Sequence, residues 1–523
     1  MIALQDLCVT LAGRRVVSDV TLPLAAGQVT ALVGESGSGK SMTALAVIGL
    51  LPDGARTGGA VRLEGRNLLD LSERDMNALR GRRIGMIFQE PMTALNPLMT
   101  IGDQVAEAFR DLGRTQALAR ARARLDRVGL SGARFPLGLY PHQLSGGQRQ
   151  RVAIAMAIAQ SPGLLIADEP TTALDVTTQA QILDLLRGLV RDEGMALLLI
   201  THDLAVVSGI ADRVAVMQHG RIVESGTTAE VFGARRHPYT RALFAAARHV
   251  PARPDARPQG PPMLQVDDAR REYRLPRPSP LSRRPVLQAV DGVSLTIARG
   301  ESVGLVGESG CGKSTLARAI MGLDALQGGT IRLGGATVAP GMAPAQRKQV
   351  QAVFQDPFGS FDPRWTVDRL VAEPFHLTGR PADWRDRVAA ALAEVGIGAE
   401  AMRRHVHEFS GGQRQRIAIA RALIIQPRLI VLDEAVSALD VRVRARVLDL
   451  LAGLRQRHGL SWLFISHDLS VVRAITDRVL VMDRGRVVEE GPTDRILSDP
   501  RHPATRRLVE ATPVIPAQWQ TPV

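Results

Sequence analysis

One glycine-rich stretch occurs twice in this chain, and it constrains the fold more than any other feature of the sequence. GESGSGKS at 34–41 returns as GESGCGKS at 307–314. Each copy follows a short apolar run, VTALV at 29–33 or SVGLV at 302–306, and precedes a helical pattern. A loop of the form GxxxxGK[ST] between a strand and a helix wraps its backbone amides around phosphates. We therefore expect two phosphate-binding units in one chain.

The lysine in each loop supports this interpretation. Only Lys40, Lys313 and Lys348 are lysines among the 65 basic residues, and two of the three stand in the loops. A slender ammonium suits the space beside β- and γ-phosphates, where a planar guanidinium does not fit. The serine after each lysine supplies a hydroxyl for magnesium. The predicted phosphate-binding residues are Gly34, Glu35, Ser36, Gly37, Ser38, Gly39, Lys40 and Ser41, and Gly307, Glu308, Ser309, Gly310, Cys311, Gly312, Lys313 and Ser314.

The duplication extends over most of the chain. The glutamines of IFQEP and VFQDP, Gln89 and Gln355, lie 266 residues apart, and from there the offset settles at 265. Between the copies, PARPDARPQGPP at 251–262 contains five prolines and reads as a semi-rigid linker. We expect a first domain over 1–250 and a second over 263–523. A second proline-rich stretch, 276–285, is predicted to be an exposed loop.

Paired acids follow an apolar run in each copy. LLIAD at 164–168 and LIVLD at 429–433 are typical of buried parallel strands that deliver a carboxylate to their C-terminal ends. Asp168 and Asp433 are predicted to hold magnesium through water, and the next residues, Glu169 and Glu434, to polarise the water that attacks the γ-phosphate. Two adjacent carboxylates in an apolar setting are costly without a cation.

Two further motifs recur at matching positions. LSGGQ at 144–148 and FSGGQ at 409–413 precede amphipathic runs, so that the serine caps a helix whose free amides attract anions. The residues concerned are Ser145, Gly146, Gly147 and Gln148, and Ser410, Gly411, Gly412 and Gln413. His202 and His467 each follow an apolar run. A lone histidine is usually structural, but its recurrence at a strand end in both copies favours a functional role.

Length, composition and net charge limit the classes of protein to which the chain can belong. A chain of 523 residues is long enough for two to four domains. It contains no uninterrupted apolar stretch of the roughly 18 residues that a membrane span needs, and its first residues lack a signal-peptide pattern. The two cysteines, Cys8 and Cys311, cannot form a disulfide framework or zinc site. The net charge of +13 suggests nucleic acid or an anionic membrane surface as a partner, but the basic residues are scattered and aromatics make up only 3%.

Taken in order, the motifs GESGSGKS, IFQEP, LSGGQ, LLIADEP, ALD and THD, and their second copies, resemble two nucleotide-binding domains of an ABC transporter. The resemblance implies α/β folds: two tandem P-loop NTPase domains, each with a mostly parallel core sheet, an antiparallel β subdomain and a helical subdomain. It also implies ATP and Mg²⁺ as cofactors, with Gln89 and Gln355 sensing magnesium beside Ser41, Ser314 and the two aspartates. His202 and His467 would contact the γ-phosphate.

In this family two domains pair head to tail. The resemblance therefore implies that the loop at 34–41 works with Ser410–Gln413, and the loop at 307–314 with Ser145–Gln148. Each half would supply part of two ATP sites, which explains why the loop occurs twice.

Within the family, MTALNPLMTIGDQV and RHPYTRALFAAA resemble the ATPases of dipeptide and oligopeptide importers, and nickel and glutathione importers are similar. This implies two integral-membrane permeases and a separate solute-binding protein as partners, with the chain peripheral on the cytoplasmic face of the inner membrane. Apolar anchors for the permeases are expected at Met92, Leu95 and Met99 and at Phe358, Phe361 and Trp365. Many relatives carry a cysteine cluster after HPYT, and since 248–262 has none we expect no iron–sulfur cluster.

Two other readings remain. Soluble tandem ABC ATPases that act on ribosomes or nucleic acid suit the positive charge, but they usually carry a long charged helical linker. A scaffold that binds ATP without hydrolysis is opposed by the two glutamates. In detail, DEAVSALD lacks the proline of DEPTTALD, which predicts a looser turn. Residues 1–33 contain no aromatic, so adenine would contact Val16 or Val17 in the first site and Tyr273 in the second.

Overall fold

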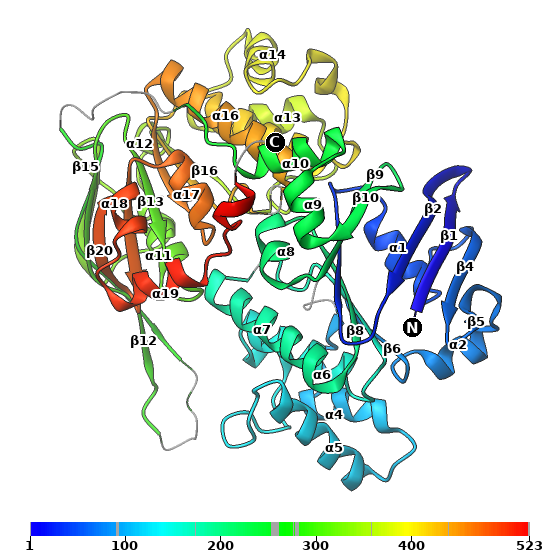
Figure 1. Cartoon of the computed structure of the whole chain (residues 1–523). Coiled ribbons are helices and arrows are strands. Elements are labelled where there is room, and N and C mark those ends of the chain that lie inside the picture. The colour runs from blue at the N-terminus through cyan, green and yellow to red at the C-terminus, as the bar shows by residue number, and fades with distance from the viewer. Residues whose placement is uncertain are drawn as a thin grey trace.

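The chain folds into two halves with the same order of elements (Figure 1). The computed structural model describes residues 2–89, 94–172, 174–252, 261–275, 277, 282–356, 358–437 and 439–520. Each half contains one six-stranded sheet and one four-stranded sheet. Within the described ranges, none of the helices is long and apolar enough to span a bilayer.

The six-stranded sheet of the first half has the order β10-β9-β3-β8-β7-β6. Its parallel members are β3 (Val29–Val33), β6 (Ile84–Ile87), β7 (Leu164–Asp168), β8 (Ala196–Thr201) and β9 (Arg213–Gln218), and β10 (Arg221–Thr227) runs antiparallel at the edge. The three strands β3, β7 and β8 are buried along their whole length, as expected of parallel strands covered on both faces.

The second half repeats this sheet with the order β16-β17-β18-β13-β19-β20. The strands are β13 (Ser302–Val306), β16 (Val350–Val353), β17 (Leu429–Asp433), β18 (Ser461–Ile465), β19 (Arg478–Asp483) and β20 (Arg486–Pro492). The mostly parallel cores predicted from the duplicated motifs are thereby confirmed in both halves.

An antiparallel sheet accompanies each core. It consists of β1 (Ile2–Leu11), β2 (Arg14–Leu24), β4 (Arg56–Leu63) and β5 (Arg66–Asn67) in the first half. The second half has β11 (Leu264–Arg274), β12 (Val286–Ile297), β14 (Gly328–Leu333) and β15 (Ala336–Thr337). The predicted loop at 276–285 joins β11 to β12, and its described residues 283–285 are exposed.

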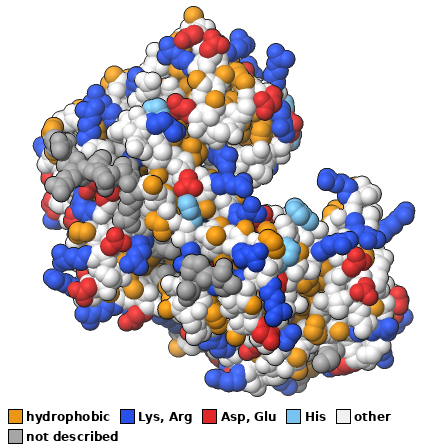
Figure 2. Space-filling view, turned by 45° about the horizontal axis from the view of Figure 1, so that its top comes forward, with side chains coloured by type: hydrophobic (Ala, Val, Ile, Leu, Met, Phe, Trp, Pro, Cys, Tyr) orange, Lys and Arg blue, Asp and Glu red, His pale blue; other side chains and the backbone are white. Residues whose placement is uncertain are grey.

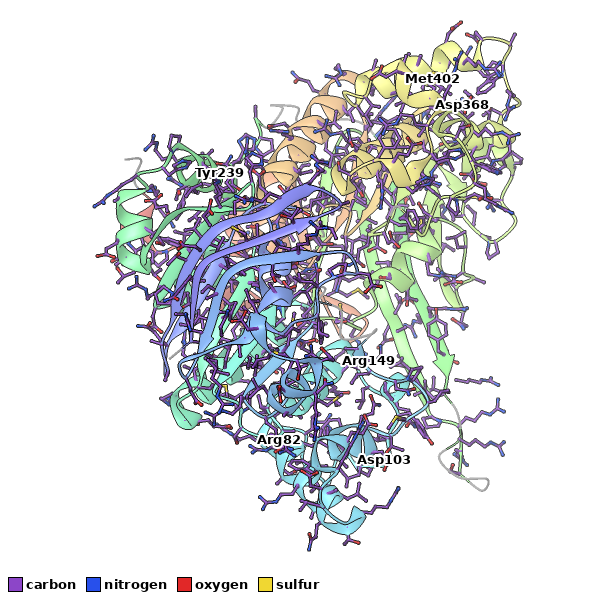
Figure 3. All side chains as sticks on the ribbon, turned by 90° about the vertical axis from the view of Figure 1, so that its right-hand side faces the viewer. Arg82, Asp103, Arg149, Tyr239, Asp368 and Met402 are labelled. Carbon is purple, nitrogen blue, oxygen red and sulfur yellow. The ribbon has the colours of Figure 1, made fainter. Side chains whose placement is uncertain are left out.

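A helical region forms the third part of each half. It contains α4 (Ile101–Ala106), α5 (Arg114–Arg127) and α6 (Gly146–Ala157) in the first half, and α13 (Val367–Ala372), α14 (Trp384–Glu394) and α15 (Gly411–Leu423) in the second. Asp103 in α4 and Asp368 in α13 occupy equivalent positions of the repeat. Figure 3 shows these two residues at opposite ends of the molecule, so the helical regions point away from each other.

The remaining helices pack around the core sheets. They are α1 (Lys40–Val47), α2 (Glu73–Leu79), α7 (Val176–Glu193), α8 (Leu204–Ile210), α9 (Thr228–Ala234), α10 (Pro238–Ala247), α11 (Lys313–Ile320), α12 (Pro344–Arg347), α16 (Val441–His458), α17 (Leu469–Ile475), α18 (Thr493–Ser498) and α19 (Pro503–Ala511).

The two halves exchange contacts through the helices at their ends. Helix α10 of the first half packs on α16 of the second, and α19 of the second packs on α7 of the first. His249 adds a hydrogen-bond contact with Asp449, with 2.6 Å between Nε2 and Oδ1. This reciprocal arrangement holds the halves together around an approximate two-fold relation.

The C-terminal segment reaches furthest across. After α19 it crosses to the first half, where Ile515 is buried in one apolar cluster with Phe232 and Phe244. The ring of Trp519 lies edge-on to Phe232, with 5.3 Å between centroids and 78° between planes. Figure 1 shows this segment, in red, beside α8 and α9. We refer to residues 513–520 below as the tail.

The domain boundaries themselves stay a prediction. Helix α10 ends at Ala247 and β11 begins at Leu264. Of the linker predicted at 251–262, residues 253–260 lie outside the described residues.

Candidate active sites

The first glycine-rich loop closes around its own lysine. Gly39, at φ 104°, caps α1, a conformation that glycine adopts without a steric penalty. A Cβ atom on Gly34 would stand 2.2 Å from the carbonyl oxygen of Met217, so only glycine fits this approach to β9. The Lys40 ammonium donates to the carbonyls of Gly34 and Glu35, at 2.8 Å each. Burial lowers the pKa of Lys40.

The second loop repeats this geometry. Lys313 donates to the carbonyl oxygens of Gly307 at 2.8 Å and Glu308 at 2.9 Å. Cys311 stands where the first loop has Ser38, and burial raises the pKa of its thiol. Both loops therefore join a strand to a helix and fold around their own lysine, and phosphate binding by them stays a prediction.

The residues predicted to hold magnesium lie together in the first half. The Ser41 side chain hydrogen-bonds to Asp168, and within the described ranges Asp168 Oδ1 is buried without a hydrogen-bond partner. Burial raises the pKa of Asp168 and, in the second half, that of Asp433. A buried carboxylate oxygen with an open coordination position beside a hydroxyl is the oxygen donor set that Mg²⁺ takes. These residues therefore fit Mg²⁺, whose positive charge would offset the free-energy cost of burying the carboxylates.

The glutamate that the sequence predicts to be catalytic in the first half, Glu169, is surrounded by hydrogen-bond donors. Gln89 Nε2 and Thr172 Oγ1 both donate to Glu169 Oε2 at 3.0 Å, and His202 Nδ1 lies 3.0 Å from Oε1. Burial raises the pKa of Glu169, but the hydrogen bond and charge of His202, the Thr172 hydroxyl and the Lys40 ammonium outweigh it. The pKa therefore falls to about 2, and the carboxylate stays ionised as a general base requires.

The second half keeps the acid and histidine but not every donor. His467 Nδ1 lies 3.2 Å from Glu434 Oε1. Burial opposes the charge of each group, yet their mutual contact lowers the pKa of Glu434 and raises that of His467. Ser437, the counterpart of Thr172, donates its hydroxyl to the backbone oxygen of Glu434 instead of its carboxylate.

The turn that carries each glutamate is the same in both halves. Glu169 has φ 47° and Glu434 has φ 50°, in the left-handed region that non-glycine residues seldom adopt. Each backbone amide donates at 2.9 Å to the neighbouring strand, to Ile200 or Ile465. The predicted loosening of the second turn, from its missing proline, is therefore not seen.

The SGGQ motifs cap their helices as predicted. Ser145 Oγ accepts from the Gln148 amide at 3.3 Å, and Gln148 Oε1 accepts from the Ser145 amide at 2.9 Å. Ser410 and Gln413 form the same reciprocal pair at 3.4 Å and 3.0 Å. Both serines are exposed, and within the described ranges no hydrogen bond joins either serine to the opposite glycine-rich loop.

Residues near the ALD motifs do reach the opposite loop. The Ser309 amide of the second loop donates to Asp175 Oδ2 of the first half at 3.4 Å. Arg442 of the second half forms an ion pair with Glu35 of the first loop, with 2.7 Å between Nη1 and Oε1. The Glu35 amide also donates to the Tyr239 hydroxyl at 3.0 Å. Sequence analysis assigned no role to Asp175, Tyr239 or Arg442, although their recurring motifs, ALD and HPYT, could have marked the first two.

The residues expected at adenine are placed differently in the two halves. The Val16 carbonyl lies against the first loop, 2.8 Å from a Cβ built on Gly39. Tyr273 lies towards the C-terminal end of α11, where its hydroxyl hydrogen-bonds to Asp324 and its ring lies 4.9 Å from the Arg271 guanidinium. Stacking of Tyr273 on adenine stays a prediction, and the ring would have to leave these partners.

Two of the predicted permease anchors are wrong. Leu95 is 3% exposed and Phe361 is 5% exposed, because both pack into the cores under the helical regions. Phe358 and Trp365 are exposed, Met99 is half-buried, and Met92 lies outside the described residues. Leu98, which sequence analysis passed over, is 85% exposed.

Comparison with known proteins agrees with this geometry. The family described as "ABC transporter" matches residues 17–172 and 290–437. The family described as "Oligopeptide/dipeptide transporter, C-terminal region" matches 223–267 and 488–522. The peptidoglycan transport ATP-binding protein YejF of Agrobacterium fabrum (strain C58) is 48% identical over 509 residues, covering 95% of this chain and 92% of that protein.

A second relative is similar along an equally long part of the chain. The glutathione import ATP-binding protein GsiA of Escherichia coli (strain K12) is 45% identical over 549 residues, covering 97% of this chain and 88% of that protein. With the two phosphate loops, the paired acids and the histidines in place, the chain belongs to the ABC transporter family, as an ATPase with two fused nucleotide-binding halves whose ATP hydrolysis is coupled to transport.

Proposed function

We propose that the chain energises the import of peptides or of small peptide-like solutes such as glutathione. The observation that carries this proposal is the match of the oligopeptide/dipeptide transporter C-terminal region at the end of both halves. Its relatives named for peptidoglycan transport and glutathione import point to the same class of solute. The proposed location is peripheral, on the cytoplasmic face of the inner membrane, beside two permeases that receive solute from a separate binding protein.

Each ATP site is composite in this proposal. ATP and Mg²⁺ bind at one phosphate loop, and closure brings the SGGQ helix of the other half onto the γ-phosphate. Contacts of Asp175 and Arg442 with the opposite loops support this pairing, because they already align each ALD with the loop of the other half. Bound magnesium would neutralise charge on the phosphates, while Glu169 or Glu434 orients the attacking water and His202 or His467 holds that acid in place.

The permeases are proposed to dock on two equivalent grooves. One is lined by Leu98, Met99, Phe109, Leu112 and Tyr140 of the first helical region. The other, in the second helical region, is lined by the exposed Trp365 together with Arg369, Glu373, His376 and Arg380, and its apolar Ala372 and Phe375 are themselves buried. Exposed apolar side chains beside charged ones suit a short amphipathic helix from each permease.

The rival reading, action on ribosomes or nucleic acid, receives no support from the matched families. On the face drawn in Figure 2, Lys and Arg side chains are interspersed with Asp and Glu and do not form a continuous basic stripe, as electrostatic binding to phosphate backbones requires. The proposal includes no nucleic acid and no iron–sulfur cluster, since Cys8 and Cys311 stand in different halves.

Reconstitution tests the proposal. The chain is combined in lipid nanodiscs with the permeases that co-purify with it, and ATPase activity is measured with a solute-binding protein loaded with dipeptide, oligopeptide or glutathione. We expect at least one of these solutes to stimulate hydrolysis, and Lys40→Ala or Lys313→Ala to abolish the stimulation. Stimulation by RNA or ribosomes, with none by any loaded binding protein, would replace the importer by its rival.

A further inference from the structure

The two phosphate loops are held in different ways, although their sequences are nearly the same. At the first loop, the Glu35 carboxylate forms an ion pair with Arg442 of the other half. At the second loop, the corresponding Glu308 faces Arg507 of its own half, at 3.7 Å. Position 177, the counterpart of Arg442, is a threonine that donates to Asp175 of its own half at 2.6 Å. Among the described residues, an ion pair between a phosphate loop and the ALD region of the opposite half therefore occurs at the first loop only, whereas the second loop is joined to the first half by the Ser309–Asp175 hydrogen bond at 3.4 Å.

The backbone and the side chain of Glu35 contact different partners. Its amide donates to the Tyr239 hydroxyl and its carbonyl accepts from Lys40, so its main chain belongs to the loop. Its carboxylate is left for Arg442. Tyr239 is 5% exposed, and its counterpart in the second half is Ala504. The second loop therefore has no tyrosine hydroxyl in the place of Tyr239 to accept this hydrogen bond.

We propose that Arg442 is a positioning residue that ties the second half to the first phosphate loop and makes the first ATP site the tighter of the two. The inference rests on the proposed composite sites. The ion pair holds the ALD of the second half against the loop of the first half before nucleotide binds. ATP therefore loses less binding free energy to ordering the two halves when it bridges them. Asp440 lines the same small cavity as Gly34 and Glu35, so this ALD already lies against the first loop.

The size of the effect follows from exposure. The side chains of Arg442 and Glu35 are 33% and 31% exposed. Ion pairs in such partly solvated positions change an equilibrium by about two- to five-fold, and salt weakens them. We expect the first site to lose about three-fold in affinity when the pair is broken, and to lose that advantage at high salt.

Binding of the ATP analogue AMP-PNP with Mg²⁺, measured by calorimetry on the full chain, tests the inference. In the Lys313→Ala background only the first site binds strongly, and there Arg442→Thr should weaken binding about three-fold. In the Lys40→Ala background, which reports the second site, Arg442→Thr should leave affinity unchanged. Arg446→Thr, one turn further along α16, serves as the matched control and should change neither site.

A conservative variant separates positioning from a general structural role. Arg442→Lys, which keeps the positive charge opposite Glu35, should retain most of the affinity that Arg442→Thr removes, and added salt should abolish the difference between the two variants. An unchanged or tighter first site in Arg442→Thr would overturn the inference, and so would equal weakening of both sites. If Lys40→Ala and Lys313→Ala each leave two binding events, the phosphate loops are not the ATP sites and the proposed function itself fails, which is a different result.

Discussion

Removing the two apolar anchors of the tail, with Ile515→Ala and Trp519→Ala together, should destabilise the first half of the molecule. Ile515 is 8% exposed in the cluster around Phe232, and truncation of such a residue costs about 2 kcal/mol at the lower end of its range. Trp519 is half-buried, and its loss with the edge-on contact to Phe232 adds about 2 kcal/mol. The total of about 4 kcal/mol predicts a fall of about 10 °C in the melting temperature of the first half.

Calorimetry together with hydrogen exchange measured by mass spectrometry reads out this effect. The first-half transition should move down, and peptides from α9 and α10 should exchange faster, while peptides from β13 and α14 in the second half stay protected. Trp365→Ala is the matched control, since that indole is exposed in the other half. Unchanged exchange in α9 and α10 would refute the reasoning, because it would mean that the tail contributes nothing to the packing of the first half.

Three further outcomes follow from the sites and grooves. Glu169→Gln with Glu434→Gln should retain ATP binding but lose at least about 100-fold in hydrolysis, and near-normal turnover in an ATPase assay would remove both residues as general bases. Because the pKa of Glu169 is about 2 when folded and 4.5 ordinarily, its stabilising effect is present above pH 4.5 and lost as the pH falls towards 2. His202→Ala removes the contact that most lowers the pKa of folded Glu169, so this stabilising effect should become smaller and its loss should be complete at a higher pH in urea unfolding, whereas an unaltered pH dependence contradicts the role given to the histidine. Leu98→Ala with Trp365→Ala should reduce co-purification with permeases and leave ATP binding intact, and undiminished co-purification would show that the grooves do not dock them.

Much of the fold follows from local pattern. Runs such as VTALV and LLIAD are short, apolar and bounded by polar punctuation, which is what a buried parallel strand requires. Ser145 and Ser410 have a glutamine three residues on, the spacing of a reciprocal helix cap. Because the chain contains each motif twice, one copy checks the other, and a lone histidine or SGGQ acquires a meaning that it lacks alone.

Contacts between distant segments were not accessible in this way. Arg442 and Glu35 are 407 residues apart, and nothing in either neighbourhood encodes the other. Leu95 and Phe361 show the converse error: their stretches resemble exposed loops rich in apolar residues, but a side chain's direction depends on what packs beneath it, and here it is core. Tyr273 lies in the expected strand, yet Arg271 and Asp324 determine where its ring lies.

The crossing of the tail has a consequence for the order in which the protein matures. Domains generally fold as they emerge from the ribosome, the N-terminal one first. The apolar cluster of the first half, however, contains Ile515 and a ring contact from Trp519, which are translated after the sheets and helices of the second half. While the second half is being synthesised, part of the apolar surface of Phe232 stays uncovered. The first half therefore completes its packing only after the second half and the tail have been synthesised, so that a message truncated before the tail yields an incompletely packed product.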